Sequence, residues 1–270
     1  MVATDKLFVG SIPEIYDNLL VPLIFDPYAS DLADRLVKLK PVHILETAAG
    51  TGALTRAVAA RLPPSVEITA TDLNQPMLDR AMSRTPDDIR ISWEQADALA
   101  LPYGDQSFDA VLCQFGVMFF PDRVQGYREA RRVLRPGGHF LLTVWDRISE
   151  NAFVNVINDT LAGIFRDNPT AFMTRTPHGY YDVEQISKEL KAAGFTSVKT
   201  ETVDHMAKGK TPLEVATAYC QGTPLRAEIE ERGGAGLENV TRTVADALTK
   251  KFGTGPIEGA IRAHIISAAR

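Results

Sequence analysis

Short apolar runs alternate with helical stretches of mixed polarity through the first half of the chain. The apolar runs at residues 42–45, 66–72, 89–97, 108–120 and 139–145 fit strands, the fourth of them running on into a loop. Between them, helices are predicted at residues 51–62, 75–84 and 126–138. This alternation at short spacing predicts a doubly wound α/β sheet with parallel strands.

The two ends of the chain depart from this alternation. Prolines 13, 22 and 27 are expected to divide residues 1–30 into short pieces, followed by a helix over 29–39. Beyond the fifth strand, helices are predicted at 150–165, 182–195, 211–221, 224–233 and 238–252, and strands at 196–205 and 260–268. The pattern predicts one domain with a helical insertion before its last strand.

Composition narrows the function. The 270 residues carry a net charge of −5 and no basic run, which argues against a nucleic-acid partner. No apolar run approaches the ~20 residues that span a bilayer. Five histidines and two cysteines lack metal-ligand spacing, so no metal site is predicted. Because the N-terminus shows no signal-peptide pattern and cysteines are few, a cytoplasmic protein is expected. The oligomeric state stays open.

The stretch "ILETAAGTG" (44–52) runs from a strand into a turn that suits a ligand. Gly50 and Gly52 let the backbone approach a ligand closely, at the strand end where α/β sheets bind their ligands. Ala48 spoils the glycine pattern of a dinucleotide site, and the Glu46 carboxylate would repel a pyrophosphate. A cationic amine or sulfonium near Glu46 is predicted instead.

Two further carboxylates follow the next two strands. Asp72 ends the second strand and can accept hydrogen bonds from both hydroxyls of a ribose. Asp97 follows the third strand and can accept from an adenine amine. Together with Glu46, these two carboxylates suit a ligand that joins an amino acid to a nucleoside and carries no phosphate. Each also has a plainer interpretation, since Glu46 and Asp72 suit helix N-termini and Asp97 suits a turn.

Four blocks of the chain resemble the class I S-adenosylmethionine-dependent methyltransferases, in particular the small-molecule group that includes the quinone C-methyltransferases. The blocks, within residues 44–146, are "ILETAAGTG", "ATDLNQPMLDRA", "QADALALPYGDQSFDAVLCQFGVMFFPD" and "REARRVLRPGGHFLLTVWD". A later segment, "KELKAAGFTSVKTETV", resembles the sixth strand unit of that fold. The chain departs from the family's D-x-G-x-G-x-G pattern at Glu46, which replaces Asp, and at Ala48, which replaces the first Gly.

The resemblance implies a Rossmann-like, doubly wound, mostly parallel seven-stranded sheet whose last strand is antiparallel, with a helical cap insertion. It implies a single methyltransferase domain over 1–270. Its parts would be an N-terminal lid region (1–40), a cofactor-binding core (41–150), substrate-side cap segments (151–181 and 211–256) and remaining sheet units (182–210 and 257–270).

The resemblance also assigns roles around S-adenosyl-L-methionine, which would leave as S-adenosyl-L-homocysteine. They are: the turn Glu46, Ala48, Gly50 and Gly52 on the methionine part; Asp72 on the ribose, flanked by Leu73 and Met77; Asp97 and Ala98 on the adenine; Gln114 near the sulfonium; and Tyr16 and Tyr28 in a lid. Met77, at helical spacing, also suits a core position.

The implied reaction is methyl transfer to O, N or C of a small molecule by in-line displacement (EC 2.1.1). A neutral amine needs no base, whereas a phenol or carbon acid does, and His178, Tyr180 and Tyr181 are candidates. Apolar side chains after the fourth strand predict an apolar or aromatic acceptor; they are Phe115, Met118, Phe119 and Phe120. The alternatives are a non-catalytic module that binds S-adenosylmethionine and, less favoured by the glycine pattern, a nucleotide-dependent oxidoreductase.

Overall fold

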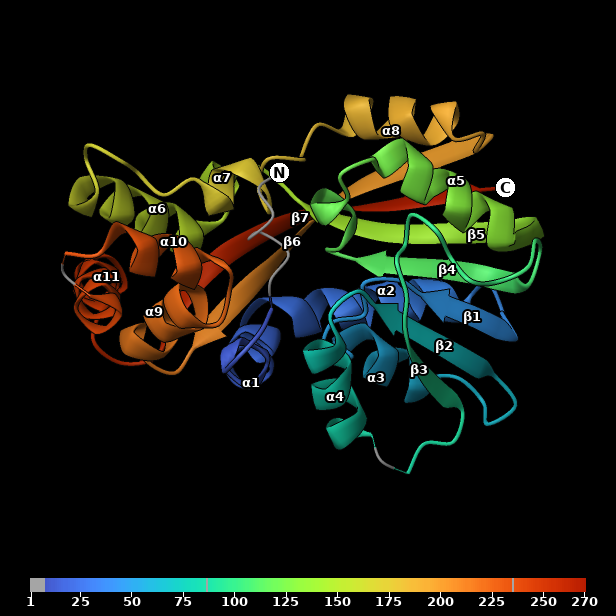
Figure 1. The fold of residues 1–270 in the computed structure, drawn as a ribbon, viewed down its shortest axis with the longest axis horizontal. Helices are drawn as coiled ribbons and strands as arrows, with labels where there is room; N and C mark the ends of the chain where they lie inside the picture. The colour runs from blue at the N-terminus through green and yellow to red at the C-terminus, as the bar shows by residue number, and fades with distance from the viewer. Residues whose placement is uncertain (1–7, 86, 235) are drawn as a thin grey trace.

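A seven-stranded sheet forms the centre of the computed structural model, which describes residues 8–85, 87–234 and 236–270 (Figure 1). The strand order is β3-β2-β1-β4-β5-β7-β6. Strands β1 to β5 are parallel, and β7 runs antiparallel to both β5 and β6. The predicted mostly parallel sheet with an antiparallel last strand is confirmed. Its strands are β1 His43–Glu46, β2 Glu67–Asp72, β3 Ile91–Gln95, β4 Phe108–Gln114, β5 Leu134–Trp145, β6 Ser197–Gly209 and β7 Ile257–Ala269.

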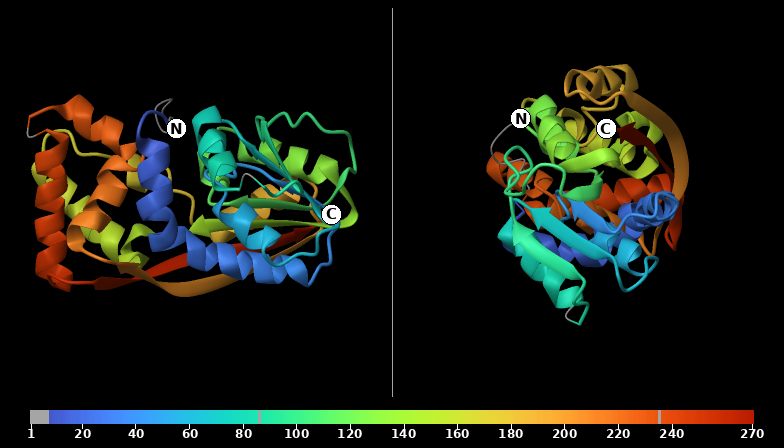
Figure 2. Two further views of the ribbon diagram at one scale, coloured as in Figure 1. Left: turned by 90° about the horizontal axis from the view of Figure 1, so that it is seen from below. Right: turned by 90° about the vertical axis from the view of Figure 1, so that its right-hand side faces the viewer.

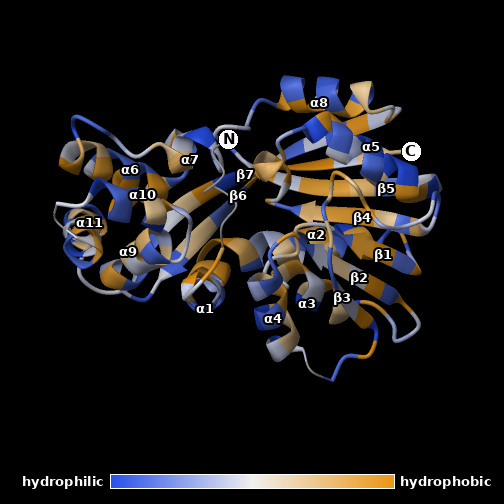
Figure 3. Cartoon of the chain, in the orientation of Figure 1, coloured by the Kyte–Doolittle hydropathy of each residue, from blue (hydrophilic) through white to orange (hydrophobic). Residues whose placement is uncertain are grey.

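Alternate residues of the central strands enter two separate cores. Ile44 and Leu112 pack in the core beneath α2 (Asp26–Val37) and α3 (Ala53–Ala59). Their neighbours Leu45 and Val111 pack in the core that includes α5 (Arg123–Val133) and α8 (Val183–Ala192). Because successive strand residues point to opposite faces, apolar runs such as "HILE" and "FDAVLC" are buried on both sides. In Figure 3 the central strands are largely orange, the colour of hydrophobic residues, which agrees with this burial.

The N-terminal segment differs from the prediction. Over its described part, residues 12–37 form a continuous helical run of α1 (Ile12–Ile15), the π-helix η2 (Tyr16–Phe25) and α2. The predicted division by prolines is wrong there, because Pro13 and Pro27 occupy first helical turns, where proline is tolerated. Pro22 lies inside the π-helix, whose wider turn is closed by the Asp26 N–H on the Val21 carbonyl.

Five helices form a cap lobe beside the carboxyl ends of the parallel strands. The long strands β6 and β7 reach from the sheet into this lobe (Figures 1 and 2). The short α7 (Phe172–Arg175) lies between the helices predicted at 150–165 and 182–195, where no helix was predicted. The apolar run after β4 turns into a 3-10 helix, η3 (Val117–Phe119). The cap helices are α6 Ala152–Ile164, α7 Phe172–Arg175, α9 Pro212–Gln221, α10 Leu225–Arg232 and α11 Leu237–Phe252. Within the described ranges no helix combines the length and apolar character needed to cross a membrane.

Candidate active site

Two adjoining cavities lie between the carboxyl ends of the strands and the cap lobe. The first, the acidic cavity, spans about 760 Å³, including space open to solvent. The second, the apolar cavity, spans about 560 Å³ on the same basis. Both are bordered by the same four aromatic residues: Phe8, Tyr16, Phe115 and Phe119. The acidic cavity is further lined by Ala48, Gly50, Asp72, Leu73, Asn74, Met77, Asp97, Ala98, Leu99 and Gln114.

Glu46 lies in a smaller recess beside the acidic cavity. The recess shares Tyr16, Gly50 and Gln114 with the larger cavity. The Glu46 side chain is 2% exposed and accepts a hydrogen bond of 2.6 Å from the Thr55 hydroxyl. Burial raises its pKa to about 8, against a smaller lowering by Thr55 and Arg56. A cation placed in this recess would therefore convert a largely protonated acid into a carboxylate.

Asp72 joins the turn after β1 to the end of β2. Its carboxylate accepts the Gly50 N–H at 2.9 Å and the Asn74 N–H at 2.8 Å. Burial raises its pKa, and these hydrogen bonds oppose the rise. The Asn74 side-chain amide also donates to Oδ1, at 3.3 Å, whereas Oδ2 accepts only the Gly50 N–H among the described residues. Oδ2 therefore keeps a lone pair that can accept a hydrogen bond from a ligand. The exposed Asp97 holds the Leu99 N–H at 2.9 Å and also lines the cavity, so the turn and ligand interpretations are compatible.

Gln114, at the end of β4, has one free polar atom. Its amide nitrogen donates to the Phe25 carbonyl at 3.0 Å, which fixes the orientation of the amide. Its Oε1 is buried and has no hydrogen-bond partner among the described residues. An unpaired buried oxygen is costly, so a ligand group with positive charge or a donor would be stabilised here.

The turn after β1 holds an alanine in a backbone conformation that favours glycine. Ala48 has φ of 52°, in the left-handed region. A Cβ built on Gly116 would lie 2.5 Å from the Ala48 Cβ and 2.7 Å from the Cys113 sulfur. Gly116 therefore provides the space that the Ala48 methyl group occupies.

One buried carboxylate attaches the helix η2 to two helices beside the acidic cavity. Asp17 lies 2.8 Å from Arg80 Nε, 3.4 Å from Arg56 and 3.5 Å from Arg84. These arginines belong to α3 and α4 (Gln75–Arg84), which flank the cavity. Its neighbour Tyr16 lines both cavities and the Glu46 recess. The contact with Asp17 thus positions Tyr16.

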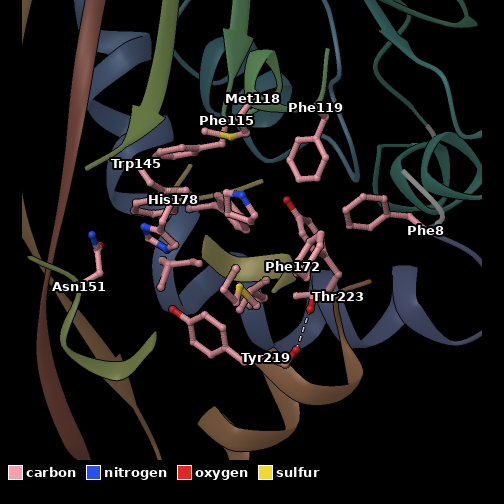
Figure 4. Close-up of a pocket in the computed structure, with 16 residues that line it drawn as sticks. Phe8, Phe115, Met118, Phe119, Trp145, Asn151, Phe172, His178, Tyr219 and Thr223 are labelled. Atoms are coloured by element: carbon pink, nitrogen blue, oxygen red, sulfur yellow. Dashed lines mark hydrogen bonds between the residues drawn. The ribbon is translucent and has the colours of Figure 1, made fainter. Parts of the chain in front are cut away.

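Aromatic side chains from the carboxyl ends of the central strands, from η2 and from the cap enclose the apolar cavity (Figure 4). Phe115 and Trp145 stack with ring centroids 3.9 Å apart. His178 lines the cavity with its Nδ1 atom 2.8 Å from the Asp146 carbonyl oxygen. Burial lowers the pKa of His178 to about 4, so this imidazole is neutral near pH 7.

Four predicted site residues lie away from the cavities. Tyr28 is fully buried, with its hydroxyl 3.0 Å from the backbone carbonyls of Val203 and Ile261, so it anchors α2 to β6 and β7. Gly52 packs behind the turn, where a Cβ would lie 2.5 Å from Trp93.

The two tyrosines proposed as bases are likewise displaced. The Tyr180 hydroxyl donates to Glu189 at 2.5 Å and contacts the Tyr127 hydroxyl. Burial raises the pKa of Tyr180 above that of a free tyrosine. The Tyr181 ring lies under the Arg147 guanidinium at 4.9 Å. Neither tyrosine lines the acidic cavity, the apolar cavity or the Glu46 recess, so the structure does not bring them together with the other candidate site residues.

Several lining residues were not predicted from the sequence. Asn74 follows Asp72 by two residues and Leu99 follows Asp97 by two, so their closeness to the strand ends was an available signal. Phe8 from the N-terminal segment and Tyr219 from α9 carry no comparable signal. Their approach depends on how the cap and η2 fold back onto the sheet.

The sequence matches a family described as Methyltransferase domain over residues 44–138. A demethylmenaquinone methyltransferase of Deinococcus radiodurans is 44% identical over 165 residues, which cover 57% of this chain and 68% of that protein. A demethylmenaquinone methyltransferase of Clavibacter sepedonicus is 32% identical over 166 residues. That match covers 58% of this chain and 66% of the relative, just under two thirds.

Among solved structures, phosphoethanolamine N-methyltransferase 2 of Haemonchus contortus, in complex with S-adenosyl-L-methionine, has a TM-score of 0.62. The superposition covers 100% of this chain and 60% of that chain at 17% identity. At this identity the likeness concerns the fold.

Proposed function

The chain belongs to the class I S-adenosylmethionine-dependent methyltransferases, and we propose that it methylates a small, largely apolar acceptor. One observation carries the proposal. An acidic cavity at the strand ends adjoins an apolar cavity, and Tyr16, Phe115 and Phe119 border both. A cofactor in the first and an acceptor in the second would meet at these aromatic rings.

The residues of the acidic cavity fit the cofactor of this family. When bound, S-adenosylmethionine supplies an activated methyl group on a positively charged sulfur. Glu46 would pair with the ammonium group, Gln114 Oε1 would face the cationic part, and Asp72 and Asp97 would hold the ribose and adenine. Among the described residues, no lysine or arginine lines this cavity, which favours a cofactor without phosphates over a dinucleotide.

The role of the protein would be to position the acceptor and exclude water. Bringing two reactants into line can itself lower a barrier by several kcal/mol. His178 is a weak base at neutral pH because its pKa is about 4. We therefore propose a reaction that depends on alignment by the aromatic border, with O, N and C acceptors all compatible.

Calorimetry with S-adenosylmethionine, S-adenosylhomocysteine and NADH tests the cofactor. Binding of the first two is expected, and binding of NADH alone would overturn the proposal. Transfer of an isotopically labelled methyl group to a panel of apolar acceptors then tests catalysis. Demethylmenaquinone, for which the two relatives are named, is the first acceptor to test, in both its quinone form and its reduced quinol form. Cofactor binding without transfer to any acceptor would favour a non-catalytic module.

A further inference from the structure

The apolar cavity contains one nitrogen atom whose chemistry is fixed by the fold. The Asp146 carbonyl oxygen can only accept a hydrogen bond, so His178 Nδ1, at 2.8 Å, must carry the proton. In a neutral imidazole the other nitrogen, Nε2, is then an acceptor. His178 is more than nine-tenths buried, and within the described ranges its side chain makes a hydrogen bond through Nδ1 and none through Nε2. Because Nδ1 is held by the Asp146 carbonyl, Nε2 is the ring nitrogen left to face the cavity that His178 lines.

A second polar atom of the same cavity comes from the cap. Tyr219, on α9, is 4% exposed and directs its hydroxyl toward the part of the cavity that His178 lines (Figure 4). In the part of the chain that the structure describes, Tyr219 accepts a hydrogen bond from Thr223 through its backbone carbonyl, and its hydroxyl makes none. A phenol hydroxyl can both donate and accept.

The rest of the lining restricts the charge of the occupant. Near neutral pH none of the described side chains around the apolar cavity is charged, since His178 is neutral and burial raises the pKa of Tyr219. A carboxylate, phosphate or ammonium group would lose its hydration there without a counter-charge, which costs several kcal/mol.

We propose that His178 Nε2 and Tyr219 Oη form a receptor for a hydroxyl group on a neutral, otherwise apolar methyl acceptor. This inference rests on the proposed function, because it takes the apolar cavity as the acceptor site. A hydroxyl donates to Nε2 and accepts from Oη at once. A ketone or ether has no hydrogen to donate to Nε2. His178 is thus a specificity-determining residue that selects a donor.

Binding of three matched probes to the S-adenosylhomocysteine complex, measured by calorimetry, tests the inference. The probes are 4-propylphenol, propylbenzene and 4-propylbenzoate. We expect the phenol to bind roughly five- to tenfold more tightly than propylbenzene, the effect of a net hydrogen bond. The benzoate should bind at least tenfold more weakly than the phenol.

Three variants separate recognition from folding. His178→Phe and Tyr219→Phe should each reduce the preference for phenol over propylbenzene, while propylbenzene and S-adenosylhomocysteine keep their affinities. Tyr180→Phe is the matched control, because that tyrosine bonds Glu189 outside the cavity and its loss should leave the preference unchanged.

Three results would overturn the inference: a preference that survives in both cavity variants, a benzoate that binds as tightly as the phenol, or no binding of any probe to the complex. Failure of S-adenosylhomocysteine itself to bind would instead refute the proposed function.

Discussion

Replacing Glu46 with glutamine is expected to stabilise the unliganded protein and to weaken cofactor binding. The Glu46 carboxyl is buried, and its pKa rises from 4.5 to about 8. Glutamine keeps an oxygen that can accept the hydrogen bond from Thr55, yet it cannot ionise. The substitution therefore removes the ionisation of this group and preserves its main contact.

The magnitude follows from proton linkage. The folded state holds the Glu46 proton more tightly than the unfolded chain does. The contribution of Glu46 to the free energy of unfolding is therefore fully present below pH 4.5. It is lost progressively as the pH rises toward 8. A pH of 7 is about 2.5 units above the pKa of this carboxyl in the unfolded chain. Its ionisation there favours unfolding by about 3 kcal/mol. Glu46→Gln should recover most of this free energy.

Urea unfolding of both proteins at pH 5.5, 6.5 and 7.5 measures the effect. The stability difference should grow by about 1.4 kcal/mol per pH unit. The exposed Glu231→Gln substitution is the matched control and should show no such growth. A pH-independent difference, or a Glu46→Gln protein no more stable than wild type at pH 7.5, would refute the buried-acid argument.

Calorimetry in two buffers of different ionisation enthalpy checks the link to the ligand. Near pH 7 the wild-type protein should release close to one proton when S-adenosylmethionine binds, because the ammonium group favours ionised Glu46. Glu46→Gln should release none and bind more weakly. Equal affinity in the two proteins would contradict the cationic contact.

Four further substitutions, two of them combined in one protein, test the site. Asp72→Ala should weaken binding of S-adenosylhomocysteine by about 1.5–3 kcal/mol in calorimetry, since it removes a charged acceptor; unchanged affinity would count against the ribose assignment. Gly116→Ala should lower the free energy of unfolding by about 1–3 kcal/mol, because its Cβ meets Ala48 at 2.5 Å. Adding Ala48→Gly should recover part of that loss, and strictly additive effects would refute the contact. Asp17→Asn should loosen η2 and speed the release of S-adenosylhomocysteine in stopped-flow measurements; an unchanged rate would contradict its role in attaching the helix.

The strand ends are the part of the site that sequence patterns predict best. In a parallel sheet the carboxyl ends meet at one edge, so a residue that ends a buried apolar run is placed without knowledge of the rest of the fold. Asp72 and Asp97 accordingly line one cavity, and Glu46 lies in the recess beside it. The position of each carboxylate at the end of an apolar run was therefore sufficient to predict that the three lie near one another.

Residues on the N-terminal helices were harder to place because their direction depends on packing. Tyr16 and Tyr28 were both expected in a lid, and they lie on the same helical run. The π-helix between them and the docking of α2 on β6 and β7 turn Tyr28 into the core and leave Tyr16 at the cavities. No spacing rule in the sequence distinguishes the two tyrosines.

The alanine in the first turn shows how a departure from a glycine pattern can be offset elsewhere. In isolation, a left-handed alanine costs about 1–2 kcal/mol, which suggests a weakened turn. Its methyl group, however, points at Gly116, on the loop after β4, the strand that pairs with β1. The turn has alanine at position 48 where the family pattern has glycine, and the loop after β4 has Gly116 opposite it. Because Gly116 has no side chain, the two loops still approach closely. Ala48 therefore marks an altered packing of the same ligand turn, and the identity of the ligand depends on the carboxylates around it.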